Sequence, residues 1–262
     1  MTGDGGAPIF SGVGVALVTL FDEGGNLDVQ ATAEHAARLV DLGVRAVAVL
    51  GTTGEPWLLT EQERVDLIEA CRGAVPDEVP VIAGTGHPDI ESAVRLTRDA
   101  KSAGADAALV LSLLGAEDQK PYYAAVAQAA PGFDLLAYHL PMLSPPGVRV
   151  EQLDELGVRG IKDSTGDAER LALEIENYSG EVYVGSPALL SLAGPLGVAG
   201  AILGIANLEP ERCAKAFEGD AGAQRLLLRD HLDSLVNFPL GLKERVAARF
   251  GTPVGVRALP QA

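Results

Sequence analysis

The sequence predicts an α/β protein in which eight strand–helix units close into a (β/α)8 TIM barrel, followed by a helical appendage at the C-terminus. Two observations carry this prediction. Short apolar runs rich in β-branched residues recur along the chain, and they are continuous rather than alternating, as parallel strands covered on both faces should be. Helical patterns lie between these runs, and a repeated strand–helix alternation favours a barrel over a doubly wound sheet.

The expected strands follow one another at fairly regular spacing. They occupy residues 12–20, 44–50, 79–85, 105–111, 134–140, 157–163, 181–186 and 199–204. The expected helices fill the intervals 28–43, 60–74, 88–104, 120–132, 167–180 and 187–197. Thr60 and Glu63 form a capping box at the start of the second helix. Pro121 fits the first turn of the fourth helix.

The C-terminal segment, residues 209–250, has helical patterns with no strand between them. No linker rich in Gly, Ser or Pro divides the chain. We therefore expect a barrel over residues 1–208 and, packed on it as part of a single structural unit, C-terminal helices over residues 209–262.

Composition and charge exclude several classes of partner. The chain is 47% hydrophobic and 21% charged, which indicates a globular protein with a sizeable core. Its formal net charge of -16 repels nucleic acid and anionic membranes, and no apolar stretch approaches the ~20 residues of a membrane span. The two cysteines form no framework, which fits a reducing cytoplasm, and the four histidines lack metal-ligand spacing. We expect no cofactor and no metal.

Lys162 is an unusual residue for its place in the predicted barrel. It is the one lysine of five that ends an apolar strand, and the active sites of such barrels lie at the C-terminal ends of the strands. A lysine there can simply extend to water or pair with Asp163. Alternatively it is a Schiff-base nucleophile, because desolvation favours the neutral amine that attacks a carbonyl.

Tyr138 ends the strand before Lys162, and adjacent strands lie ~4.8 Å apart. Its phenol can therefore reach the neighbourhood of the lysine amine. Imine formation needs a group that both donates and accepts a proton, which a phenol can do. Taken alone, Tyr138 is better explained as a core tyrosine with a satisfied hydroxyl.

The segment GTTGE, residues 51–55, ends the second predicted strand. Gly54 lets the backbone approach a ligand, and the hydroxyls of Thr52 and Thr53 with exposed N–H groups can form an anion cradle. A plain strand-to-helix turn is the alternative interpretation. A lysine, a phenol and this cradle, each at a predicted strand end, are together more specific than any one of them.

Three segments, GTTGEPWLLTEQER, AYHLP and GIKDSTG, resemble the signatures of the dihydrodipicolinate synthase/N-acetylneuraminate lyase family. The resemblance runs from about residue 9 to about residue 257. It implies a barrel lyase of the class I aldolase type in which Lys162 forms the Schiff base with a 2-oxo acid. It also implies that Tyr138 and Thr52 relay protons, that Thr53 binds the keto-acid carboxylate, and that Gly185 and Ile202 line the pocket.

The chain also departs from the family pattern. Leu113 and Leu114 replace the tyrosine motif that follows the fourth strand, and Met142 and Leu143 stand where synthases carry a carboxylate-binding arginine. We therefore expect these four residues to line an apolar outer pocket that favours apolar or hydroxylated aldehydes. The positions that bind feedback lysine in the family read Glu61, Arg64 and Pro88, which implies no inhibition by lysine.

The leading hypothesis is a Schiff-base-forming 2-oxo-acid lyase that condenses or cleaves a pyruvate unit with an aldehyde. We expect the protein to be a carbon–carbon or carbon–oxygen lyase. We also expect it to be cytoplasmic and to form a homo-oligomer, a dimer or a tetramer. One alternative is dihydrodipicolinate (4-hydroxy-tetrahydrodipicolinate) synthase itself or a sugar-acid dehydratase that uses the same imine. Another is a barrel that has lost turnover and binds a ligand. The aldehyde and the direction of reaction stay open.

Overall fold

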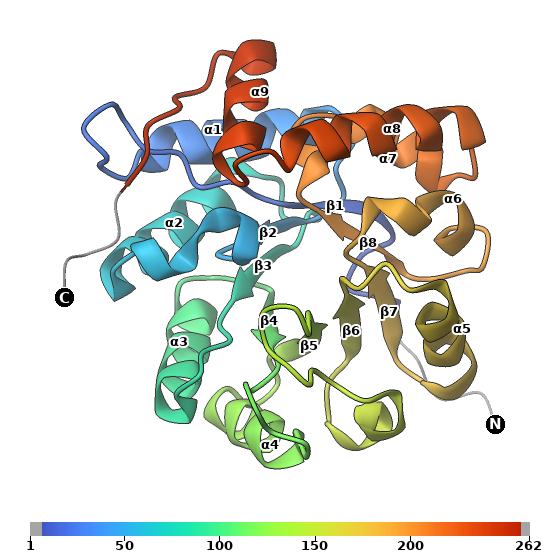
Figure 1. Cartoon of the computed structure of the whole chain (residues 1–262). Coiled ribbons are helices and arrows are strands. Elements are labelled where there is room, and N and C mark those ends of the chain that lie inside the picture. Colours follow the sequence, from blue (N-terminus) through green and yellow to red (C-terminus); the bar gives the residue numbers. More distant parts are fainter. Residues whose placement is uncertain (1–6, 258–262) are drawn as a thin grey trace.

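The computed structural model describes residues 7–257 and confirms the predicted barrel (Figure 1). Eight parallel strands pair in chain order, and the last closes on the first, where Gly14 is in register with Ile202. The strands are β1 (Gly12–Ala16), β2 (Val47–Val49), β3 (Val81–Gly84), β4 (Ala107–Leu111), β5 (Asp134–His139), β6 (Gly160–Asp163), β7 (Glu181–Val184) and β8 (Gly200–Leu203). Each lies inside one predicted segment.

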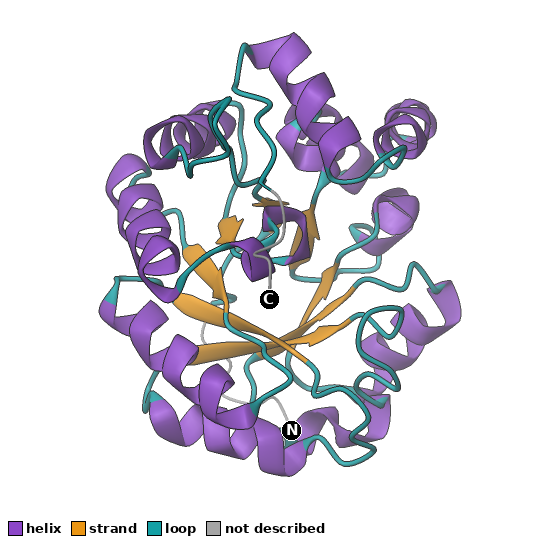
Figure 2. Ribbon diagram, turned by 60° about the vertical axis from the view of Figure 1, so that its left-hand side comes forward, coloured by secondary structure: helices purple, strands orange, loops and turns teal. Residues whose placement is uncertain are grey.

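Helices surround the barrel as an outer ring (Figure 2). They are α1 (Val29–Asp41), α2 (Glu61–Ala74), α3 (Ile90–Ser102), α4 (Lys120–Ala129), α5 (Ala168–Asn177), α6 (Leu190–Ala193), α7 (Pro210–Phe217), α8 (Ala221–Ser234) and α9 (Leu240–Phe250). The connection from β5 to β6 carries a 3-10 helix, Val150–Glu155, in place of an α-helix.

Side-chain caps explain where several of these helices begin. The Thr60 hydroxyl accepts from the Glu63 N–H, and the Glu63 carboxylate accepts from the Thr60 N–H, which confirms the predicted capping box. The Asp28 carboxylate caps α1 by accepting from the Ala31 N–H. Pro121 lies in the first turn of α4, as predicted, where its missing N–H costs no helical hydrogen bond.

Two apolar layers hold the barrel together. The larger lies between strands and helices and contains most of the buried Val, Leu and Ile side chains. The smaller fills the barrel interior, where Phe10 and Tyr183 stack with ring centroids 4.7 Å apart. Phe10 precedes β1, so this aromatic pair fills the interior near the N-terminal ends of the strands. Tyr138 and Ile202 belong to the same interior layer, and the candidate site lies at the opposite end of the barrel, at the C-terminal ends of the strands.

The C-terminal helices continue the core of the barrel. α7 follows β8 and packs against β1 and α6, and α8 packs against α7. Buried side chains of α7, α8 and α9 belong to the same apolar cluster as the strands; among them are Cys213, Leu227 and Val246. The division of the chain at residue 208 stays a prediction.

Within residues 7–257, no helix is long and apolar enough to cross a membrane.

Candidate active site

Tyr138 and Lys162 are brought together by the register of β5 and β6. Their Cα atoms are direct partners in the parallel ladder, so both side chains point to the same face of the sheet. Lys162 Nζ lies 4.4 Å from the centroid of the Tyr138 ring. Both residues are almost completely buried, with 4% and 6% of their surface exposed for Lys162 and Tyr138. The sequence-based pairing of these two residues is therefore confirmed as a contact.

The phenol of Tyr138 is chemically activated by its neighbours. Burial would raise the pKa of this phenol, but the charge of Lys162 and interactions with the side chains of Thr52 and Ser164 outweigh it and lower the pKa. Thr52 comes from the turn after β2, whereas Ser164 directly follows β6. Thr52 was predicted from the sequence, whereas Ser164, two residues after the lysine in the same motif, was not.

Gly185 makes room for the lysine. A Cβ atom at this position would lie 1.9 Å from Ser164 Oγ and 2.9 Å from Lys162 Cε, so any other residue would displace one of them. Gly185 directly follows β7, and its N–H donates to the Asp163 carbonyl at 2.6 Å. Gly185 therefore leaves space for the side chains of Lys162 and Ser164, and it extends the hydrogen bonding between β6 and β7.

The GTTGE segment folds into a tight turn of unusual conformation. Thr52–Gly54 form one 3-10 turn, and Leu50 and Glu55, on either side of it, have positive φ angles of 60° and 51°. Non-glycine residues adopt this region rarely, and such strain gathers at functional sites. The Gly54 carbonyl accepts a hydrogen bond of 2.7 Å from the Thr19 hydroxyl. Neighbouring elements therefore hold the turn in place.

The other predicted binding residues lie around the same barrel mouth. Thr53 is buried, and its hydroxyl is the atom nearest to the position of a Cβ on Gly204, just after β8. Ile202 lies in β8 with 1% of its surface exposed and packs in the barrel interior with Tyr138. Thr52, Thr53, Lys162, Gly185 and Ile202 thus come from four strands that converge on one end of the barrel.

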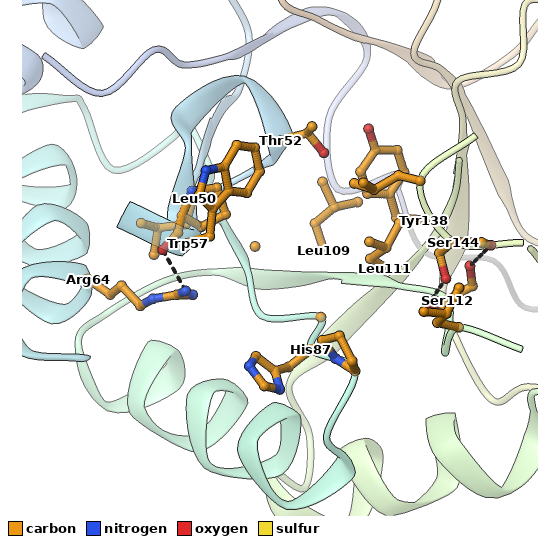
Figure 3. Close-up of a pocket in the computed structure, with 17 residues that line it drawn as sticks. Leu50, Thr52, Trp57, Arg64, His87, Leu109, Leu111, Ser112, Tyr138 and Ser144 are labelled. Carbon is orange, nitrogen blue, oxygen red and sulfur yellow. Dashed lines mark hydrogen bonds between the residues drawn. The ribbon is translucent and has the colours of Figure 1, made fainter. Parts of the chain in front are cut away.

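A cavity of about 520 Å³ opens beside this cluster (Figure 3). Of the predicted site residues, Thr52 and Tyr138 line it, whereas Lys162, Thr53, Gly54, Gly185 and Ile202 do not. The full lining comprises Leu50, Gly51, Thr52, Pro56, Trp57, Arg64, Gly84, Gly86, His87, Pro88, Leu109, Leu111, Ser112, Leu114, Tyr138, Leu143 and Ser144. Its volume suits a small organic ligand.

The outer pocket is less apolar than the sequence predicted. Leu114 and Leu143 line it as expected, but Leu113 packs against the core and Met142 is 89% exposed, so neither of these two belongs to the lining. An arginine from another element, Arg64 of α2, also lines the cavity. Trp57 and His87 were missed as well. All three lie in loops or a helix whose approach to the barrel axis depends on tertiary packing.

A second buried lysine supports the site from the C-terminal helices. Lys243 of α9 is 1% exposed and forms an ion pair with Glu55, the last residue of GTTGE. Burial lowers the pKa of Lys243, and the Glu55 carboxylate counteracts this effect. Nothing local to the segment GLKERV predicts the burial of Lys243, which is one of the four lysines that do not end a strand.

Within residues 7–257, no three His, Cys, Asp or Glu side chains are grouped to hold a metal ion. The groups described above at the barrel mouth are an amine, a phenol and hydroxyls. A parallel barrel with a buried lysine and a phenol on neighbouring strand ends has the architecture of the class I aldolase-type lyases.

Comparison with known proteins gives the family. Residues 9–237 match the model of the dihydrodipicolinate synthetase family, and the chain belongs to this family. It is a lyase of the class I aldolase type. An uncharacterised DapA-like lyase of Halobacterium salinarum is 33% identical over 94% of this chain and 78% of its own length. The 4-hydroxy-tetrahydrodipicolinate synthase of Thermus thermophilus is 37% identical over 77% of this chain and 73% of its own.

The solved structures agree with the fold. The dihydrodipicolinate synthase of Acinetobacter baumannii, complexed with pyruvate, superimposes with a TM-score of 0.85 at 26% identity. The match covers 97% of this chain and 93% of that one.

Proposed function

We propose that Lys162 forms a Schiff base with pyruvate or another 2-oxo acid, and that Tyr138 and Thr52 move the protons this reaction requires. The single observation that carries the proposal is the direct pairing of Tyr138 and Lys162 on neighbouring strands, with the amine 4.4 Å from the ring centroid. Pyruvate as the 2-oxo acid is supported by the similar dihydrodipicolinate synthase of Acinetobacter baumannii, which was solved as a complex with pyruvate.

The chemistry follows from these positions. The neutral Lys162 amine attacks the 2-oxo carbon, and one amine proton passes by way of Tyr138 to the former carbonyl oxygen, which becomes a hydroxyl. The phenol of Tyr138 then gives its own proton to this hydroxyl, which leaves as water, and a phenolate remains. The resulting iminium withdraws electrons, so the neighbouring carbon loses a proton and attacks an aldehyde. The same iminium allows a carbon–carbon bond to break in the reverse direction. Because the pKa of Tyr138 is lowered, its phenolate is more accessible as the base that receives protons.

The carboxylate of the 2-oxo acid would bind at the GTTGE turn. The hydroxyl of Thr53 offers a donor at the barrel mouth, and Gly54, whose N–H donates to the Gly51 carbonyl, would keep the turn clear of side-chain atoms. Gly185 and Ile202 would bound the space around the reacting carbon. Thr52 would pass protons to and from Tyr138, whose pKa it already influences.

A panel of aldehydes tests the reaction type. Purified protein is incubated with pyruvate and each aldehyde, products are resolved by mass spectrometry, and Lys162→Ala serves as the blank. We expect at least one product heavier than its aldehyde by the mass of pyruvate. A sugar-acid dehydratase would instead remove water from a sugar acid without any aldehyde, and a dihydrodipicolinate synthase would show a strong preference for aspartate semialdehyde. A barrel that only binds a ligand would give no product.

We further propose that the protein is a cytoplasmic homo-oligomer, a dimer or a tetramer. Leu114, Met142 and Leu143 lie near the cavity mouth with 53%, 89% and 47% of their surface exposed, which supports a contact with a second subunit. A monomer in light scattering at micromolar concentration would contradict this assembly.

A further inference from the structure

After α9 the chain folds back across the barrel. The helix ends at Phe250, and Gly251, with a φ angle of 72°, turns the backbone away from it. We call residues 251–257 the C-terminal strap. The strap runs beside residues 21–27 of the β1–α1 loop toward the start of α2 (Figure 1).

Backbone contacts hold the strap against the β1–α1 loop. The Gly255 N–H donates to the Phe21 carbonyl at 3.1 Å, and Arg257 Nε donates to the Gly25 carbonyl at 2.7 Å. The two segments lie very close together, because a Cβ atom on Gly255 would lie 1.8 Å from the Asp22 carbonyl oxygen. The strap can therefore occupy this position only with a glycine at residue 255.

Arg257 connects the strap to the segment that follows GTTGE. Its Nη1 donates to the Leu58 carbonyl at 3.2 Å and to the two carboxylate oxygens of Glu63 at 2.8 and 2.9 Å. Leu58 ends the 3-10 turn Pro56–Leu58, and Glu63 belongs to the capping box of α2. One guanidinium thus joins the strap, the β1–α1 loop and the start of α2.

The ring of Phe21 contacts two cations of the C-terminal segment. The Arg257 guanidinium lies 4.8 Å from the centroid of this ring, and Lys243 Nζ lies 4.7 Å from it, both within the range of a cation–π interaction. Lys243 pairs with Glu55, the last residue of GTTGE. Residues 55–58 are therefore attached to the C-terminal segment at both ends, by Lys243 and by Arg257.

The GTTGE turn requires attachment because its backbone is strained. Glu55, with a φ angle of 51°, connects the 3-10 turn Thr52–Gly54 to the 3-10 turn Pro56–Leu58. The hydrogen bonds inside these turns are local, such as that from the Leu58 N–H to the Glu55 carbonyl at 3.0 Å. A strained backbone persists only where the surrounding structure over-determines it.

We propose that Arg257 is a positioning residue that, through the C-terminal strap, holds the GTTGE turn in the conformation that binds the carboxylate of the 2-oxo acid. Arg257 lies outside the cavity lining, so it acts through Leu58 and Glu63. Thr52 and Trp57 do line the cavity, so a shift of the turn would change the site. The identity of the ligand rests on the proposed function, whereas the attachment of the turn does not.

Hydrogen–deuterium exchange tests the attachment without any substrate. Amides of the two turns, such as those of Gly54 and Leu58, are hydrogen-bonded and therefore have protection to lose. In Arg257→Gln, exchange over residues 51–59 should become about tenfold faster, as the loss of a hydrogen bond to a charged group implies, whereas exchange over β6 should not change. Unchanged exchange in residues 51–59, or an equal rise in both segments, would overturn the proposal.

Arg249→Gln is the matched control within the same segment of the chain. Arg249 of α9 donates to the two carboxylate oxygens of Glu211 at 3.1 and 3.0 Å, and its guanidinium lies 4.8 Å from the centroid of the Phe250 ring. These contacts are of the same kinds as those of Arg257, but they do not involve the GTTGE turn. Arg249→Gln should therefore leave exchange over residues 51–59 unchanged, and an equal effect of the two variants would overturn the proposal.

Two further variants test whether the strap is the route by which Arg257 acts. Arg257→Lys keeps the charge but loses the planar fork, so its effect should be smaller than that of Arg257→Gln. Gly255→Ala keeps Arg257 but forces the strap away from the Asp22 carbonyl, so it should speed exchange over residues 51–59 as Arg257→Gln does. No change in Gly255→Ala would contradict the role of the strap.

The pyruvate dependence of adduct formation on Lys162 measures the consequence for binding. In Arg257→Gln the half-saturating pyruvate concentration should rise roughly tenfold, and the rate at saturation should change less than about threefold, because the turn binds the carboxylate and Lys162 performs the attack. An unchanged half-saturating concentration would mean a merely structural role and would overturn the proposal. Faster exchange in the turn of Arg257→Gln, without any pyruvate adduct in the unmodified protein, would retain the strap and reject the proposed function.

Discussion

The Cα atoms of Tyr138 and Lys162 are direct partners across the β5–β6 ladder, and the lysine amine lies over the tyrosine ring. Tyr138 also lines the cavity, whereas Lys162 does not. A 2-oxo acid that enters from the cavity therefore meets the phenol on its way to the amine. We therefore expect that removing the phenol hydroxyl slows imine formation.

Tyr138→Phe should slow imine formation roughly 10²–10⁴-fold, the usual effect of losing an acid–base group, while the ring keeps its apolar contacts. The rate is measured by stopped borohydride reduction after increasing times of incubation with pyruvate. Tyr183→Phe is the matched control, since Tyr183 is the ladder partner of Lys162 on β7 but its hydroxyl is hydrogen-bonded to Phe10 and Glu181. Equal rates in the two variants would contradict the role of Tyr138.

Gly185→Ala should abolish most adduct formation, because the new Cβ would lie 1.9 Å from Ser164 Oγ and 2.9 Å from Lys162 Cε. The measurement is the fraction of protein that gains the mass of reduced pyruvate. Gly73→Ala, inside α2 with no atom within 4 Å of the new Cβ, should leave this fraction unchanged. It should also stabilise the protein by roughly 0.5–1 kcal/mol. Full adduct formation in Gly185→Ala would show that the space is not needed.

Lys243→Met should destabilise the protein by roughly 3–5 kcal/mol, because it leaves the Glu55 carboxylate without its buried partner. The substitution should also weaken pyruvate binding, since Glu55 ends the GTTGE turn. Denaturant unfolding and the pyruvate dependence of adduct formation measure the two effects. The double variant Lys243→Met, Glu55→Gln should regain much of the stability. Additive losses in the double variant would mean that the two side chains are not coupled.

Glu174 should make the stability depend on pH. Burial and the nearby charge of Asp163 raise the pKa of Glu174 from an ordinary value of 4.5 to about 8, although the charge of Arg170 acts in the opposite direction. Between these values the folded protein keeps a proton that the unfolded chain releases, so the free energy of unfolding falls as pH rises, by up to ~1.4 kcal/mol per pH unit.

Glu174→Gln should remove this contribution. The free energy of unfolding of the variant, relative to that of the unmodified protein, should therefore increase as pH rises from about 5 to about 8. Urea unfolding at a series of pH values measures it. Parallel stability curves for the two proteins would contradict the raised pKa.

Much of the fold could be predicted because its signals are local. Each apolar run predicted one strand, and the capping box at Thr60 marks the start of α2 correctly. The 3-10 segment between β5 and β6 had no comparable signal, since the run after Tyr138 lacks a helical period. Boundaries of the strands were overestimated for a physical reason, because buried loops at a barrel mouth are as apolar as the strands themselves.

The site was predictable only where chemistry coincides with a strand end. Lys162 and Tyr138 stand at such ends, and their spacing in a barrel determines that they meet. Arg64 and Lys243 lie on helices, and a charged residue on a helix normally faces water. Arg64 reaches the cavity because the turn before α2 brings that helix against the barrel mouth, and Lys243 is buried by packing across nearly 190 residues of sequence.

Borohydride trapping of the Schiff base tests the central claim most directly. The protein is incubated with pyruvate, reduced, digested and mapped by mass spectrometry, with Lys162→Ala in parallel. Lys162 should carry the added mass, and Lys162→Ala should carry none. Because Lys243 is also buried, mapping the modified residue shows which of the two lysines reacts. An adduct on Lys243, or no adduct on Lys162 with any of several 2-oxo acids, would contradict the account.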